Sequence, residues 1–220
     1  MPSNTFSITA APGTDIWRKP PTTNVFNAPT ALPSSPSGAA LRTAGPLASF
    51  RSARLSFNFA PAAQYDQAGL LLSFRRRGDA GAAPPAKWIK TGVELYNARP
   101  RLSTVSCDSW ADWSVADLHP AAAAAAAATG AGQEEIGWTT VLVEKDKDGN
   151  GTGVWVYRLV RNAETGEEEK VPLREICWVF GLEKLEEWEV DVSAMAARPE
   201  KGVAEGLVAE FGGLEVKWAE

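Results

Sequence analysis

Two stretches of the sequence decide the fold: Tyr65-Asp66-Gln67-Ala68-Gly69-Leu70-Leu71-Leu72 and, after a loop, Trp88-Ile89-Lys90-Thr91-Gly92-Val93-Glu94-Leu95. Both alternate, which predicts β-strands, because successive side chains of a strand point to opposite faces of its sheet. Each predicted strand has one apolar face. The other face carries polar, aromatic and glycine residues, namely Tyr65, Gln67 and Gly69 in the first strand and Trp88, Lys90, Gly92 and Glu94 in the second. Pairing of the strands would gather these groups on one surface, where the glycines leave room for a ligand or another backbone.

The rest of the chain repeats this pattern of short alternating segments between turn residues. Such segments occur at residues 6–10, 54–59, 101–107, 138–144, 154–160, 173–180, 188–195 and 214–218. We find no long amphipathic helix and no internal repeat. The pattern predicts one all-β domain over residues 1–220, an antiparallel β-sandwich of the jelly-roll type.

Three segments interrupt the strands. Residues 27–40 are rich in proline, serine and alanine and predict a long loop, and residues 108–114 predict a polar, aromatic corner. Residues 115–134 contain eight consecutive alanines without an amphipathic stripe. A helix this short is marginal in water, so we expect a flexible surface insertion there.

The composition and charge of the chain argue against two classes of protein, those that bind nucleic acids and those that span membranes. The chain has 220 residues, 45% of them hydrophobic, and a formal charge of −5 with both signs mixed along the sequence. No basic patch interleaved with aromatic residues indicates a nucleic-acid partner, and no apolar run reaches the ~18 residues of a membrane span. The first residues lack the features of a secretory signal, so we expect a soluble, cytoplasmic protein in which Cys107 and Cys177 are buried thiols.

One turn resembles half of a calcium-binding loop. Asp146, Asp148 and Asn150 stand at positions 1, 3 and 5, and glycine follows at position 6. Position 12 is Tyr157, where a calcium loop needs glutamate, and the flanking segments are predicted strands. A hairpin turn is the preferred interpretation; these three residues are the candidate ligands if a metal binds, and no cofactor is expected.

Lys90 and Glu94 are the best candidates for chemistry. Four residues apart on a strand, they are separated by ~13 Å along the chain, so they must converge on a ligand or be bridged through Gln67. A glycosidase needs two carboxylates across the scissile bond, and this stretch offers no second acid on the face of Glu94. We also find no nucleophile elbow, phosphate loop or cysteine–histidine pair.

Several segments, taken in order, resemble the family of bacterial YesU-like proteins and fungal "regulation of enolase" proteins. They are Tyr65–Leu70, Trp88–Glu94, Ser109–Ser114, Leu173–Trp178, Ala196–Pro199 and Phe211–Trp218. The resemblance implies a concanavalin A-like lectin/glucanase sandwich. It also adds Trp113, Arg174 and Trp178 to the candidate ligand-binding residues Tyr65, Gln67, Trp88, Lys90 and Glu94.

Three functions follow as hypotheses. The preferred one is a binding protein for a carbohydrate or a similar polar small molecule, held by stacking on aromatic rings and by hydrogen bonds from Gln67, Lys90, Glu94 and Arg174. The second is an isomerase, lyase or cyclase in which Glu94 or Lys90 acts as acid or base. The third, implied by the fungal family name, is a regulatory module with a protein partner.

Overall fold

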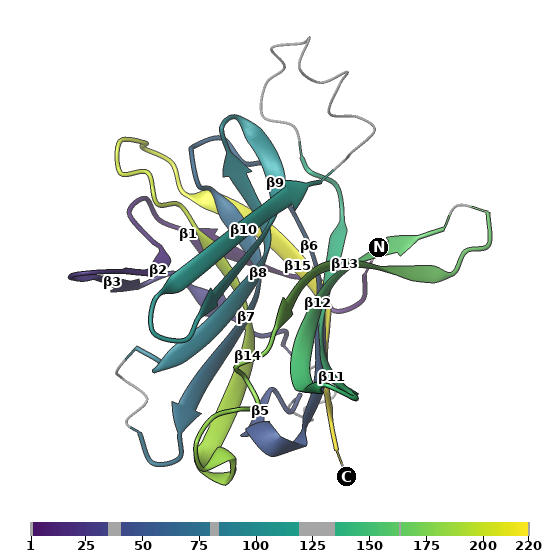
Figure 1. Ribbon diagram of the computed structural model, residues 1–220. Coiled ribbons are helices and arrows are strands. Elements are labelled where there is room, and N and C mark those ends of the chain that lie inside the picture. The colour runs from purple at the N-terminus through teal and green to yellow at the C-terminus, as the bar shows by residue number, and fades with distance from the viewer. Residues whose placement is uncertain (1, 35–40, 80–83, 119–134, 163, 220) are drawn as a thin grey trace.

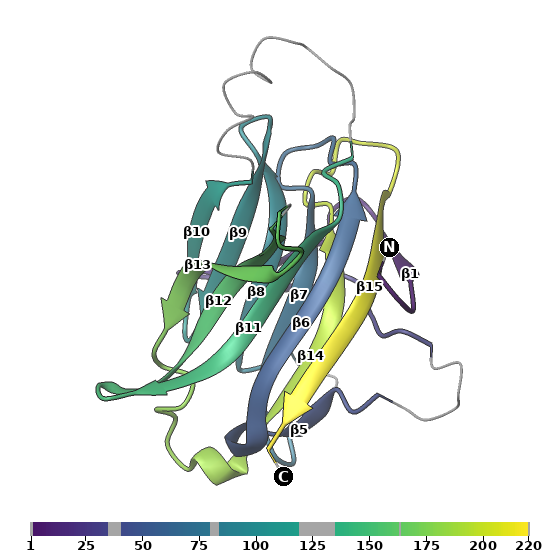
Figure 2. The same cartoon turned by 90° about the vertical axis from the view of Figure 1, so that its right-hand side faces the viewer.

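The computed structural model describes residues 2–34, 41–79, 84–118, 135–162 and 164–219. It shows an antiparallel β-sandwich of two large sheets packed face to face (Figures 1 and 2). The fold class predicted from the alternating segments is therefore confirmed. None of the helices within the described ranges is long and apolar enough to cross a membrane.

The first sheet has six strands. In spatial order they are β1 (Phe6–Ala10), β15 (Leu207–Trp218), β6 (Phe50–Phe59), β11 (Thr139–Asp148), β12 (Gly151–Arg161) and β13 (Glu168–Ile176). The second sheet has seven strands, in the order β10 (Ala111–Asp117), β9 (Arg99–Cys107), β8 (Lys87–Tyr96), β7 (Gln67–Arg76), β14 (Trp188–Ala197) and β4 (Thr30–Ala31), with β5 (Ala44–Pro46) also paired to β14. Within the described residues, two short 3-10 helices, Leu47–Ser49 and Leu185–Glu187, lie in connections.

The main core fills the space between the two sheets. It is built from the apolar alternate positions of both, among them Leu55 and Phe57 on β6, Leu70 and Leu72 on β7, and Ile89 on β8, all at most 1% exposed. The side chains at the other alternate positions of β7 and β8 therefore point away from the six-stranded sheet. We call this outer surface of the seven-stranded sheet the site face.

A small hairpin of β2 (Ile16–Lys19) and β3 (Thr23–Phe26) lies against the site face (left in Figure 1). Its Ile16 is fully buried in a second apolar cluster that includes Trp88, Val105 and Met195. The site face is thus partly covered, and the side chains beneath the hairpin are removed from solvent.

The structure corrects three local predictions. Residues 111–117 form the edge strand β10 instead of continuing a corner, and the loop predicted at 27–40 contains the short strand β4. Cys107 is buried as expected, but Cys177 is exposed; both are free. In the predicted insertion, Leu118 is buried and residues 119–134 lie outside the described residues.

The two glycines of the central strands face each other across β7 and β8. A Cβ atom on Gly69 would lie 2.2 Å from the carbonyl oxygen of Thr91, and one on Gly92 would lie 2.1 Å from that of Ala68. Of the two sequence-based explanations for these glycines, close approach of another backbone is the one found. The neighbouring strand itself forbids a side chain at either position.

We expect Gly69→Ala to lower the free energy of unfolding by at least about 2 kcal/mol, because the added methyl group meets backbone atoms that cannot move without breaking the strand pair. Urea denaturation measures this change. Gly149→Ala is the matched control, since a Cβ there meets nothing within 4 Å. Equal stability of the two variants would contradict the explanation.

Candidate functional site

A buried ion pair fixes the end of the site at which β7 begins. The Arg198 guanidinium donates from Nε to Oδ1 of Asp66 (2.9 Å) and from Nη2 to Oδ2 (2.7 Å). The Asp66 side chain is 0% exposed, and its Oδ2 also accepts the backbone N–H groups of Ala62 and Ala63. A carboxylate with this many charge-assisted and backbone donors is held in one orientation. The chain on both sides of Asp66 is held with it.

The backbone of Arg198 also binds the segment Gly13–Thr14, which precedes β2. Its carbonyl oxygen accepts hydrogen bonds from the N–H groups of Gly13 (2.8 Å) and Thr14 (3.2 Å), and its N–H donates to Oγ1 of Thr14 (3.1 Å). These bonds place the next residue, Asp15, above the site face just before β2 begins. Sequence patterns gave no indication of this contact.

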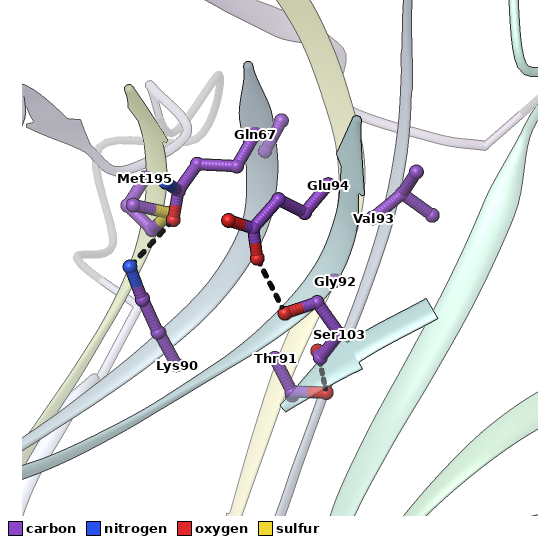
Figure 3. Close-up of a pocket in the computed structure, with 9 residues that line it drawn as sticks. Gln67, Lys90, Thr91, Gly92, Val93, Glu94, Ser103 and Met195 are labelled. Atoms are coloured by element: carbon purple, nitrogen blue, oxygen red, sulfur yellow. Dashed lines mark hydrogen bonds between the residues drawn. The ribbon is translucent and has the colours of Figure 1, made fainter. Parts of the chain in front are cut away.

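Lys90 is 5% exposed and lies in a network of polar side chains (Figure 3). Its Nζ donates to Oε1 of Gln67 (2.7 Å) and contacts Oδ1 of Asp15 (3.4 Å). The ammonium also lies 5.9 Å from the ring centroids of both Trp17 and Trp88. Gln67 is in direct cross-strand register with Glu94, and its amide nitrogen donates to the carbonyl oxygen of Tyr65 (3.1 Å) and lies 3.4 Å from Oδ1 of Asp15.

Glu94 is 6% exposed and its carboxylate is fixed from the next strand. The hydroxyl of Ser103 on β9 donates to Oε2 of Glu94 (2.8 Å), and the indole N–H of Trp113 donates to the oxygen of Ser103 (2.9 Å). Burial raises the pKa of the Glu94 carboxyl above its usual value, while the positive charge of Lys90 and the Ser103 hydrogen bond partly oppose that rise. Figure 3 shows the second carboxylate oxygen directed toward the side of Gln67 and Lys90.

Above these groups lies a cavity of about 500 Å³, which we call the site cavity. Its lining combines residues of the hairpin, the central strands and β10, namely Asp15, Trp17, Lys19, Tyr65, Lys90, Glu94, Val105, Trp113 and Pro199. It is a polar floor with aromatic walls, the combination typical of small-molecule sites.

Tyr65 is the most exposed ring of this wall, at 40%. Its backbone has a φ of 67°, a region that non-glycine residues rarely adopt and that is found preferentially at functional sites. Its N–H donates to the carbonyl oxygen of Leu95 (2.8 Å), and its ring packs near those of Tyr96 and Trp113 at centroid distances of 6.1 and 6.4 Å. A strained backbone thus holds an aromatic surface open to the cavity.

Four of the candidate ligand-binding residues are not among those that line the site cavity, namely Gln67, Trp88, Arg174 and Trp178. Gln67 is bonded to Lys90 beside it. Trp88 lies on the site face, as the alternation predicts, but it is only 1% exposed because the hairpin of β2 and β3 covers it. Trp178 donates its indole N–H to Oγ of Ser106, and Arg174 contacts Asp112 and Ser114, so both lie at the edge between the two sheets. They line a separate hollow of about 260 Å³. The structure does not bring Arg174 and Trp178 into the cavity of Lys90 and Glu94.

Sequence analysis also missed residues that the cavity uses. Asp15 and Trp17 come from a segment about fifty positions before β7, and Ser103 and Tyr96 were not singled out. The central stretch holds no second acid on the face of Glu94, and the second carboxylate of the cavity, Asp15, comes from outside that stretch. The only available signal was the brief apolar piece around Ile16 and Trp17 before Pro20-Pro21.

The candidate calcium turn is a hairpin turn between β11 and β12. Oδ1 of Asp148 accepts the N–H groups of Asn150 (2.7 Å) and Gly151 (3.1 Å), and these hydrogen bonds lower the pKa of its carboxyl. Asp146 lies within β11, in register with Gly153. No group of three or more His, Cys, Asp or Glu side chains in the described ranges is arranged to hold a metal ion.

Residues 1–218 match the family model described as "Protein of unknown function (DUF1349)". The chain belongs to the DUF1349 family. An uncharacterized protein of Emericella nidulans is 34% identical to it over 213 residues, which cover 96% of this chain and 86% of the relative.

Among solved structures, this DUF1349 chain is similar to a functionally unknown protein from Saccharomyces cerevisiae. The TM-score is 0.53 at 17% identity, and the match covers 100% of this chain and 91% of the yeast chain. This likeness shows a shared fold. A GH43 protein from Bacillus licheniformis matches with a TM-score of 0.44 at 12% identity, over 77% of this chain and 27% of that one.

We expect Asp66→Asn to lower the free energy of unfolding by about 3–5 kcal/mol, because it leaves the buried charge of Arg198 without a partner. Chemical denaturation measures the loss. The control is Glu168→Gln, which breaks a similar two-bond contact to Arg54 on the surface and should cost less than about 1 kcal/mol. Similar losses in the two variants would contradict the anchoring role of the buried pair.

The raised pKa of Glu94 predicts a pH-dependent difference between the wild type and Glu94→Gln. Because the folded chain holds this proton more tightly than the unfolded chain, stability falls as the pH rises from 4.5 through the folded-state pKa. Thermal melts between acid and neutral pH should show the variant gaining stability relative to the wild type as the pH rises.

Glu168→Gln should behave in the opposite sense. Arg54 lowers the pKa of the Glu168 carboxyl, so the contribution of Glu168 to the free energy of unfolding is present at neutral pH and is lost as the pH falls.

Melting curves of Glu94→Gln that run parallel to the wild type at all pH values would show that burial does not penalise the Glu94 carboxylate.

Proposed function

We propose that this protein binds a small polyhydroxylated molecule, a carbohydrate or a compound similar to one, in the site cavity. The observation that carries the proposal is the combination of aromatic walls with a buried, charged and hydrogen-bonded floor in one cavity of about 500 Å³. Pockets for small molecules commonly have volumes of about 300–1,000 Å³ and place a few polar groups among apolar ones.

The chemistry of the lining matches a sugar in two ways. The rings of Trp17, Tyr65 and Trp113 offer apolar faces on which the C–H face of a sugar ring can stack. The floor offers both donors and acceptors: an ammonium group has three N–H donors, and the described contacts of Lys90 engage Gln67 and Asp15. Glu94 supplies acceptor oxygens beside it. Hydroxyl groups satisfy both kinds of partner, because each can donate and accept.

The alternative of a regulatory module with a protein partner is less well supported. It requires a contiguous exposed apolar patch. Among the residues that the structure describes, the exposed large apolar side chains lie on different elements, for example Trp110 before β10, Val171 on β13 and Val208 on β15. The binding proposal includes three further expectations. They are a narrower relationship to the YesU-like and fungal "regulation of enolase" proteins, a small-molecule or glycan partner, and a cytoplasmic location.

Binding is tested by isothermal calorimetry and tryptophan fluorescence with a panel of neutral and acidic mono- and oligosaccharides. We expect Tyr65→Ala and Trp113→Phe to weaken binding of any sugar that the wild type binds, by roughly tenfold or about 1.4 kcal/mol, since one loses a stacking surface and the other the N–H that holds Ser103.

Trp110→Ala is the matched control, because Trp110 is 47% exposed and lies outside the site cavity. It should leave affinity unchanged. Trp88→Ala, in contrast, should lower the melting temperature, because Trp88 is buried in the apolar cluster below the hairpin. Absence of binding across the whole panel would overturn the proposed function.

A further inference from the structure

Lys90 and Glu94 are both at least 94% buried and both line the site cavity, yet they are not paired with each other. In the part of the chain that the structure describes, the ion pair of Lys90 is with Asp15, and Glu94 is held by Ser103. Two opposite charges buried side by side lose least when they contact directly. Instead, the ammonium donates to the amide oxygen of Gln67 and the carboxylate accepts from Ser103 (Figure 3), so the two charges have separate partners while they line one cavity.

Such an arrangement fits a reacting group that is bound between a base and a cation. Resting on the proposed function, we propose that the site cavity is also catalytic. Glu94 removes a proton from the carbon next to the carbonyl group of a bound open-chain sugar, and Lys90 stabilises the oxygen anion that forms.

The step balances without a further reactant. The C–H bond adjacent to the carbonyl breaks, its proton passes to Glu94, and its electron pair forms the carbon–carbon double bond of an enediolate. The carbonyl oxygen takes the negative charge beside the ammonium of Lys90. Return of the proton to the same carbon regenerates the sugar. Interconversion of an aldose and a ketose needs one more transfer: the proton of the hydroxyl group on the deprotonated carbon passes to the former carbonyl oxygen, and Glu94 then returns its proton to the former carbonyl carbon.

Glu94 is the base in this proposal because the other carboxylate of the cavity is already engaged. Oδ1 of Asp15 accepts the N–H of Ile16 (2.7 Å) and lies 3.4 Å from both Nε2 of Gln67 and Nζ of Lys90. Asp15 therefore holds the donors in place and acts as a positioning residue. Hydrolysis by two free carboxylates fits this arrangement less well than abstraction of a proton by one.

Burial also adjusts the strength of Glu94 as a base. It raises the pKa of the carboxyl toward the neutral range, where a general base combines ionisation with proton affinity. The hydrogen bond from Ser103 keeps one oxygen oriented and leaves the other directed toward the cation side of the cavity (Figure 3).

The test follows hydrogen–deuterium exchange at carbon. The protein is incubated in heavy water with D-glucose, D-xylose, D-fructose or dihydroxyacetone, and proton NMR records loss of the signal at the carbon next to the carbonyl. Binding of the same compounds is measured in parallel by calorimetry. We expect exchange by the wild type to rise with pH as Glu94 ionises, with a midpoint above the 4.5 of an ordinary glutamate.

Variants separate the catalytic role from a structural one. Glu94→Gln should retain binding and lose exchange by at least about 100-fold. Glu94→Asp, which keeps a carboxylate but withdraws it, should retain weak exchange and the rise with pH. The control Glu186→Gln changes an exposed carboxylate in a 3-10 helix and should leave exchange unchanged. Thermal melts establish that each variant is folded.

The possible results separate the two proposals. Binding without exchange, or exchange that is unchanged in Glu94→Gln, overturns the catalytic inference and leaves the binding function standing. No binding and no exchange with any compound overturns both.

Discussion

The contact between Asp66 and Arg198 is the interaction on which the site depends. It joins the residue before β7 to the residue after β14, and the backbone of Arg198 then holds Gly13 and Thr14. Arg198 therefore sets the relative position of three chain segments, because its guanidinium holds Asp66 and its backbone holds Gly13 and Thr14. Tyr65 and Gln67 flank Asp66, while Asp15 follows Thr14. The positions of Tyr65 in the aromatic wall and of Asp15 above the site face therefore both depend on the contacts of Arg198.

The second constraint is the tight pairing of β7 with β8 at Gly69 and Gly92. With no side chains at these positions, the two backbones approach closely. Gln67 and Glu94, two pairs along, are then opposite each other, and the long side chain of Lys90 reaches Gln67. Lys90 is bonded to Gln67 and Glu94 to Ser103, so the site holds two opposite charges that are not paired with each other. A sandwich that needed only stability has no use for such an arrangement.

Sequence reasoning found the local part of this site and missed the remote part. The period of two on a strand is a local property, so the common face of Gln67, Lys90 and Glu94 could be predicted from the two central stretches alone. Coverage of a face is not local: Trp88 has the same parity, but the hairpin of β2 and β3 buries it. The same limit hid Asp15 and Trp17, whose positions depend on hydrogen bonds to Arg198, and it misplaced Arg174 and Trp178, which lie at the edge between the sheets.

The contact between Asp66 and Arg198 also determines when the cavity can form during synthesis of the chain. Asp66 and Arg198 are 132 residues apart in sequence, and Thr14 is 184 residues from Arg198. During synthesis the first strands leave the ribosome long before Arg198 does. Contacts between such distant residues form late, because the chain must close a long loop to make them. A nascent chain can therefore contain every cavity-lining residue up to Trp113 and still lack the cavity.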